Sequence, residues 1–414
     1  MKVRRPRSEY LKLWAASAIS SLGDGIGGIA APLLAAALTR DPAQVAGMSF
    51  VEQLPWLLFG LISGAIVDRF DRRIIMGIVD LLRMTLMGIL ALAVLGNWAS
   101  IPLLYAVFFL LGSADTLFGN ASQTILPQIV DHDQLEHANS RLYTAELVNN
   151  NFVGPPLGGL LFAAARPIPF LADAVSFAAS SLLVLLLRGR FSPERVVGAP
   201  RTTLRAEIIE GLKSLWVHNT LRTLAIMVGI MNLLTTSALA VFVLFVRSEL
   251  GLGGLGFGLL ISSGALGGLA GTLVVDRIIR RVGADRALFG SFLTNAATFA
   301  VIAFSRNAFI VGAMLAISAL STVAWNVITV SFRQTAVPKE ILGRVNSVYR
   351  LLASGGTAIG ALIGGFIARG FGLVAPYWIA AIALAITSGA LLPIVRAGTI
   401  SRSRAREALV GPDA

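Results

Sequence analysis

Long apolar runs dominate this chain and restrict it to folds that cross a membrane. A helix needs about 20 apolar residues to cross about 30 Å of hydrocarbon, and runs of this length recur through the 414 residues, of which 56% are hydrophobic and 14% charged. The strict alternation of apolar and polar residues that marks a membrane β-barrel is missing from the sequence. Twelve membrane-spanning helices are predicted, at residues 10–38, 44–68, 74–95, 101–126, 138–165, 169–188, 220–247, 255–277, 285–304, 308–334, 344–368 and 374–395.

A charged hinge between apolar runs occurs twice. Residues 64–73 close the second run, and residues 271–281 repeat the core Asp-Arg-x-x-Arg-Arg 208 residues later. Repeats of this size in so apolar a chain are typical of secondary transporters. The sequence therefore predicts an all-α integral membrane protein built from two pseudo-symmetric six-helix bundles. The hinge residues are Gly64, Asp68, Arg69, Arg72 and Arg73, with Asp276, Arg277, Arg280 and Arg281 in the second copy.

The repeat sets the expected domain boundaries. Residues 1–188 form an N-terminal bundle, 189–219 a cytoplasmic linker, 220–395 a C-terminal bundle and 396–414 a basic tail. Within the linker, apolar residues from Leu204 to Trp216 recur at helical spacing opposite charged ones. This pattern predicts an amphipathic helix that lies along the membrane face and connects the two bundles.

The net charge of +12 is explained by membrane topology. With an even number of spans both termini lie on one side, and 28 of the 34 Lys and Arg fall on that side. This is the positive-inside bias, so both termini are expected in the cytoplasm and no nucleic-acid partner is needed. The first apolar run is too long for a signal-peptide core and is expected to be retained.

The residue types needed for metal, redox or nucleotide chemistry are scarce. The sequence contains no cysteine, three histidines, all expected in loops, and no phosphate-binding Gly-x-x-x-x-Gly-Lys-Ser/Thr segment. No arrangement of nucleophile, base and orienting group is recognisable. We therefore expect no cofactor, no metal site and no enzymatic activity.

Acidic residues inside predicted helices are the candidate functional groups. Asp24 lies near the middle of the first helix between glycines, where an unpaired carboxylate costs at least about 2.5 kcal/mol and should face a cavity or a partner. Its counterpart in the repeat is Asn232, and that of Asp115 is Asn326. The proton-coupling or substrate candidates are Asp24, Glu52, Asp115, Glu146, Asn149, Asn150, Asn232 and Asn326. Because every mid-span acid is in the first half, titrating groups are expected there.

Three further groups receive a structural interpretation. Asp80 and Arg83 are spaced to meet on one helix face and are expected to neutralise each other near the cytoplasmic side. Glu52 and Asp173 are expected close to the outer surface. Gly154, Pro155, Gly158 and Gly159 should kink the fifth helix and give room for a neighbour, so packing alone is an alternative to a functional role.

The hinge, the duplication and the twelve spans together resemble the major facilitator superfamily. Asp71 replaces the second glycine of that family's hinge signature, and Gly154-Pro155-x-x-Gly158-Gly159 looks like its antiporter motif. Shorter motifs, among them Ser21-Leu22-Gly23-Asp24 and Asp80-Leu-Leu-Arg83, are similar to the macrolide-efflux and enterobactin-exporter branch of drug:proton antiporters. The fourth helix lacks the arginine that many proton-coupled exporters carry.

The sequence and this resemblance together predict a secondary active transporter. We expect proton-coupled efflux of an amphipathic organic compound, such as a macrolide-like antibiotic, siderophore or metabolite, by alternating access. The expected setting is a monomer surrounded by lipid in a bacterial inner membrane. The hinge charges are candidates for a gate, with orientation in the membrane as the alternative role. An importer or facilitator, or a lipid translocase, remains as the alternative function.

Overall fold

The structure is a computed structural model that describes residues 7–67, 69–131, 134–189, 191, 216 and 218–402. Asp68 of the first hinge and residues 403–414 of the basic tail lie outside the described residues. The same holds for residues 192–215, which contain most of the predicted linker helix.

The chain divides into two compact units. One comprises Met1–Val197 and Val246–Ser262, the other Gly198–Phe245 and Ser263–Ala414. The division follows the sequence repeat except that residues 246–262 pack with the first unit.

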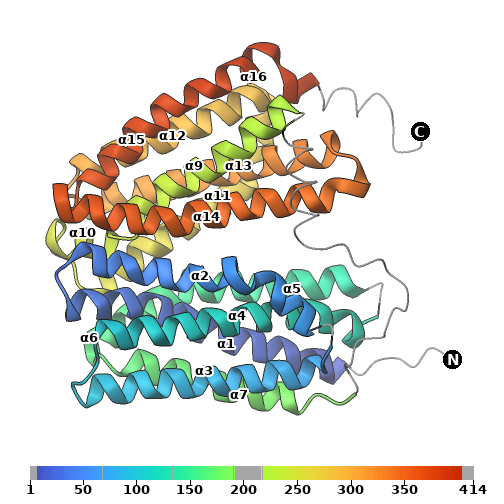
Figure 1. Ribbon diagram of the computed structural model, residues 1–414, viewed down its shortest axis with the longest axis vertical. Coiled ribbons are helices and arrows are strands. Elements are labelled where there is room, and N and C mark those ends of the chain that lie inside the picture. Colours follow the sequence, from blue (N-terminus) through green and yellow to red (C-terminus); the bar gives the residue numbers. More distant parts are fainter. Residues whose placement is uncertain are drawn as a thin grey trace. The chain divides into compact units, whose positions relative to one another are not determined.

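The first half of the chain is a bundle of long helices (Figure 1). Proline or glycine marks several of the helix ends: Pro42 begins α2, Gly96 follows α3, and Pro167 precedes α7. Its helices are α1 (Arg7–Leu38), α2 (Pro42–Val67), α3 (Arg72–Leu95), α4 (Ile101–Ile129), α5 (Leu135–Val148), the π-helix η2 (Asn149–Val153), α6 (Gly154–Ala164) and α7 (Ile168–Leu185).

The second half repeats this plan after the linker. Its helices are α9 (Asn219–Leu239), α10 (Phe242–Ser248), α11 (Gly254–Val282), α12 (Ala284–Phe304), α13 (Ala308–Ala336), α14 (Lys339–Phe371), α15 (Ala375–Ser388), the short 3₁₀ turn η3 (Gly389–Leu391) and α16 (Leu392–Ala397). Ten helices among the described residues are long and apolar enough to span a membrane. Two further predicted spans correspond to α2 and to the interrupted helix α5–η2–α6, so the all-helical membrane fold is confirmed.

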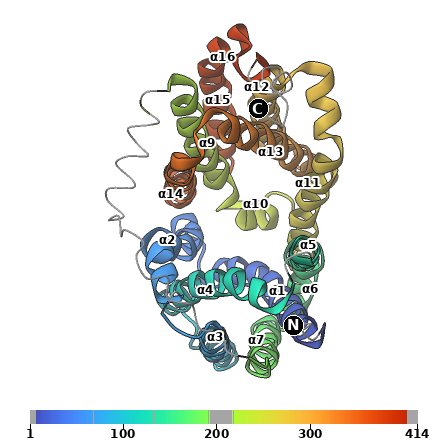
Figure 2. The ribbon, with the colours of Figure 1, turned by 90° about the vertical axis from the view of Figure 1, so that its right-hand side faces the viewer.

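The helices have equivalent neighbours in both units, as Figure 2 lets the reader follow within each. In the first unit, α1 packs on α7 and α6, α3 packs on α7 and α4, and α2 packs on α4. In the second, α9 packs on α15 and α14, and α12 packs on α15 and α13. The Ser263 hydroxyl of α11 donates to the Gly312 carbonyl of α13 at 3.0 Å. The shared order is what a duplicated six-helix bundle predicts.

The α-helix of the fifth span is interrupted just before its two prolines. Residues 149–153 form a π-helix, and Pro155 and Pro156 stand just beyond it. Proline has no N–H to donate to the preceding turn, and a π-helical turn is a common way to absorb such a break within a helix. The kink predicted from the two prolines is therefore present as a local change of helix type.

The second hinge differs from its predicted form. Asp276, Arg277, Arg280 and Arg281 belong to α11, which stays helical to Val282. The turn comes at Gly283, whose φ of 86° suits glycine because it has no Cβ. In the first half the helix ends earlier, at Val67.

An acidic residue at the start of α3 and of α12 anchors the end of each bundle. Asp71 caps α3 by accepting from the Arg73 amide at 3.0 Å, and it also accepts from the Phe191 amide at 3.1 Å. Asp285 of α12 accepts from the amides of Ile400 and Ser401, both at 3.0 Å. Each carboxylate thus ties the chain beyond the sixth span to the third span of its own bundle.

Candidate transport site in the first unit

A cavity of about 430 Å³ lies within the first unit, between α1, α2, α3, α4, α5 and α7. Among its described lining residues, five carry carboxyl groups and Arg83 is the single basic one. The acids are Asp24, Glu52, Asp115, Glu146 and Asp173. Serines of α1 and the rings of Trp56, Phe118 and Phe177 complete an amphipathic lining.

Glycines of α1 bring Asp24 into this cavity. A methyl group at Gly23 or Gly27 would overlap the Asp173 carboxylate of α7, and one at Gly25 would overlap the backbone at Asn149. Small residues allow such close approach between membrane helices. Asp24 therefore lies where α1 is in contact with both α7 and the interrupted fifth span.

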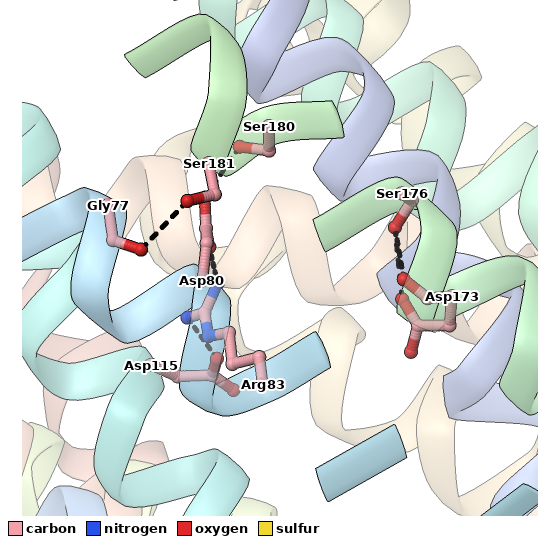
Figure 3. A network of polar contacts seen from close by, with 8 residues as sticks. All are labelled: Gly77, Asp80, Arg83, Asp115, Asp173, Ser176, Ser180 and Ser181. Atoms are coloured by element: carbon pink, nitrogen blue, oxygen red, sulfur yellow. Dashed lines mark hydrogen bonds and ion pairs between the residues drawn. The ribbon is translucent and has the colours of Figure 1, made fainter. Parts of the chain in front are cut away.

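Arg83 connects three helices through carboxylates and a hydroxyl (Figure 3). It forms an ion pair with Asp115 of α4 and a second one, at 3.4 Å, with Asp80 of its own helix. Asp80 also accepts a hydrogen bond of 2.6 Å from the Ser180 hydroxyl of α7. Asp80 and Arg83 are buried, with 0% and 3% of their surface exposed. Such a pair is tolerated in a bundle interior because the charges compensate one another.

Two aromatic rings flank the same guanidinium. The carbon at its centre lies 4.6 Å from the ring centroid of Phe118 and 5.3 Å from that of Phe177. Both are within the range of a cation–π interaction.

The structure brings five of the eight predicted polar candidates to one place. Asp24, Glu52, Asp115, Glu146 and Asn150 all line the cavity. Neighbouring Asn149 instead joins α1 to the fifth span: its amide donates to the Ala18 carbonyl at 2.7 Å and to the Ser21 hydroxyl at 3.3 Å.

The remaining candidates lie elsewhere. Asn232 of α9 donates to the Ala353 carbonyl of α14 at 3.2 Å, which holds its own bundle together, and Asn326 of α13 is exposed. In the first hinge, Arg73 donates to the Leu187 carbonyl at 2.8 Å, so it is bound to the end of α7. In the second hinge, all four charged residues are exposed on the surface of α11: Asp276, Arg277, Arg280 and Arg281.

The antiporter-like glycines make close helix contacts within the first unit. A methyl group at Gly154 would overlap Gly25 of α1, and one at Gly158 would overlap the Ile26 backbone. Gly159 meets the backbone of Gly254, and the carbonyl of Pro155 lies against Gly258. Gly254 and Gly258 belong to the segment 246–262, which is part of the first unit.

Two sequence interpretations need correction. Asp173 lies near the start of α7, as expected, but it does not face solvent there: it is 1% exposed and lines the cavity. The Asp80–Arg83 pair forms as predicted, but Arg83 lies halfway along α3 and reaches the cavity instead of the cytoplasmic edge. The sequence signal that could have identified both was present: each is a charged residue inside a predicted span, which is a functional candidate by default.

A bundle of membrane helices that lines a polar cavity is typical of secondary transporters. A family model described as "Transmembrane secretion effector" matches residues 7–408, and the chain therefore belongs to this family of the major facilitator superfamily. The predicted superfamily is confirmed.

Curated relatives share sequence along nearly the whole chain. The multidrug efflux pump Tap of Mycolicibacterium fortuitum is 28% identical over 394 residues, covering 90% of this chain and 92% of that one. Tap of Mycobacterium tuberculosis (strain H37Rv) is 28% identical over 411 residues, covering 93% and 91%.

Solved transporters share the fold at low identity. The nucleoside transporter NupG superposes with a TM-score of 0.74 at 11% identity, covering 93% of this chain and 98% of that one. An inward-facing bacterial homologue of the iron transporter ferroportin gives 0.71 at 18% identity, covering 94% and 98%. In the part of the chain that the structure describes, no group of three or more His, Cys, Asp or Glu is arranged to hold a metal ion.

Proposed function

We propose that this transporter exports amphipathic organic cations in exchange for protons across a bacterial inner membrane, with both termini in the cytoplasm. The observation that carries the proposal is the composition of the cavity, where five carboxyl groups surround one guanidinium. The relatives called multidrug efflux pumps support the direction of transport.

Charge balance supplies the mechanism. Several carboxylates that share a cavity repel one another, and each is costly to ionise away from water. A bound proton or a bound cation relieves the same excess negative charge, so the two ligands compete. Competition for shared carboxylates couples uphill export of a cation to downhill entry of protons when the bundles alternate access.

Asp24 is the acid best placed to exchange ligands. It is open to the cavity, whereas Asp173 is buried against Gly23 and Gly27 and holds the Ser176 hydroxyl at 3.2 Å. Glu52 and Glu146 line the cavity from α2 and α5. We assign the proton-coupling role first to Asp24. Asp115 is the second candidate, and it is also the ion-pair partner of Arg83.

The hinges are proposed to stabilise one orientation of the transporter. Arg73 is held by the Leu187 carbonyl of its own bundle, so the gating role is assigned to hinge charges that are exposed. Charge-assisted contacts made by such groups stabilise one conformation and must break when it changes. The exposed arginines of α11 are available for acidic groups or anionic lipid.

The test is efflux of a fluorescent cationic dye from proteoliposomes, with and without an imposed pH gradient. We expect gradient-driven efflux in the wild type, its loss in Asp24→Asn, and its retention in Asp41→Asn, which makes the same change between α1 and α2. Gradient-driven efflux by Asp24→Asn would remove Asp24 from the mechanism. Dye movement that ignores the gradient would indicate facilitated transport, and accumulation against the export direction would indicate an importer.

A further inference from the structure

The surroundings of Arg83 form a receptor for a planar cation. We propose that its guanidinium occupies an organic-cation subsite, and that substrates bearing a guanidinium or amidinium group compete with it for Asp115 and Phe118. This inference rests on the proposed function and names the substrate class of the same cavity.

The charges at the subsite are unbalanced by one, so a ligand with a single positive charge would neutralise them. Asp80 and Asp115 are both ion-paired to Arg83, so two carboxylates share one guanidinium. When a ligand cation takes Asp115, Arg83 keeps Asp80, its neighbour one turn away on α3. The result is two neutral pairs, which is a cheaper arrangement in a membrane interior than one pair with an excess charge.

The two carboxylates differ in access in the way this exchange requires. The Asp115 side chain is 42% exposed, whereas the Arg83 side chain is 4% and the Asp80 side chain 0% exposed. A ligand in the cavity therefore reaches Asp115 without displacing the buried pair. The Nε atom of Arg83 finds no acceptor within the described chain, so its hold on the subsite is incomplete.

The aromatic faces select the shape of the ligand. Phe118 and Phe177 lie against the guanidinium at distances suited to cation–π contact. Planar delocalised cations stack on such rings and pair with carboxylates through parallel N–H donors, which a compact ammonium does less well. The cavity volume of about 430 Å³ is within the range of small-molecule sites.

Calorimetry on the full chain in lipid nanodiscs tests the subsite with a matched pair of probes. Phenylguanidinium carries the planar cation, and phenylurea has nearly the same shape without the charge. We expect phenylguanidinium to bind at least tenfold more tightly. Equal affinity for the two probes would overturn the proposal.

Two phenylalanines of α4 locate the binding position. Phe118→Leu keeps apolar volume but removes the ring beside Arg83, so it should weaken phenylguanidinium binding about fivefold. Phe109 of the same helix is not among the residues that line the cavity, and its ring packs on Phe59 of α2 with the ring centroids 6.1 Å apart. Phe109→Leu should therefore stay within twofold of the wild type. Equal effects of the two substitutions would overturn the placement of the subsite.

Removing the resident cation tests the competition itself. Arg83→Ala alone leaves Asp80 buried without its counter-ion, so the informative variant is Asp80→Asn/Arg83→Ala, which removes both charges. Its affinity for methylguanidinium should exceed that of the wild type by tenfold or more. An affinity equal to that of the wild type would exclude Arg83 as a competitor.

These binding measurements need no pH gradient and no flux. Failure of phenylguanidinium to bind, with gradient-driven dye efflux intact, removes the subsite and leaves the proposed function standing. Specific binding without gradient-driven efflux has the opposite meaning, because it retains the subsite and removes proton coupling.

Discussion

The two bundles join their third and fourth spans with different chemistry at equivalent positions. In the first, Arg83 of α3 pairs with Asp115 of α4 beside an open cavity. In the second, Asn295 lies 212 residues after Arg83, is fully buried, and joins α12 to α13 through neutral groups. The side-chain NH₂ group of Asn295 donates to the Ser321 hydroxyl at 2.7 Å, and its side-chain oxygen accepts from the Ser318 hydroxyl at 2.6 Å.

The difference teaches that duplication has preserved the packing of the helices, while the mid-span carboxylates and Arg83 lie in the first half only. Amides and hydroxyls satisfy buried hydrogen bonds without a change of charge, so the Asn295 cluster joins two helices and has no charge to exchange with a proton or a cation. Carboxylates and a guanidinium can exchange partners with protons or cations. The second bundle is accordingly interpreted as the scaffold and the first as the site of chemistry.

The largest effect on this comparison is expected from Arg83→Leu. It leaves Asp80 as an uncompensated buried charge, which costs about 3–5 kcal/mol. Thermal unfolding of the detergent-solubilised chain should shift strongly, and the double variant Asp80→Asn/Arg83→Leu should recover part of the loss. A shift no larger than that of Asn295→Leu would contradict the charged nature of the first network.

An intermediate effect is expected from Asn295→Leu. The hydrogen bonds lost there are neutral, which corresponds to about 1–3 kcal/mol, and the Ser321 hydroxyl still bonds the Ser318 carbonyl at 2.8 Å. Stability should fall, while dye efflux by the folded protein keeps its response to the pH gradient. Loss of that response would show that coupling extends into the second bundle.

The smallest effect is expected at the matched anchors. Asp71→Ala and Asp285→Ala each remove a carboxylate that accepts backbone N–H groups at or near a helix start, worth about 0.5–2 kcal/mol. Hydrogen exchange should increase at the Phe191 amide in the first variant and at the Ile400 and Ser401 amides in the second. Unchanged exchange would mean that packing alone secures these segments.

Much of the fold could be predicted from sequence because membrane helices must satisfy their own backbone hydrogen bonds. That requirement makes apolar length a direct measure of each span, and the predicted spans differ from the helices mainly at their ends. The sequence predicted the second hinge at residues 276–281, by analogy with the first copy of the motif. These residues continue α11 instead, and the chain turns at Gly283, which lies outside the motif.

The site was predicted less completely. The sequence by itself determined that the mid-span acids lie in the first half and that Asp24, between glycines, needs a cavity or a partner, because an ionisable group in hydrocarbon is costly. Only the tertiary structure decided that Asp173 and Arg83 belong to that cavity. Which side chains converge depends on how each helix is rotated and how closely the helices approach. Those quantities are set by contacts between distant residues, such as Gly23 and Gly27 against Asp173.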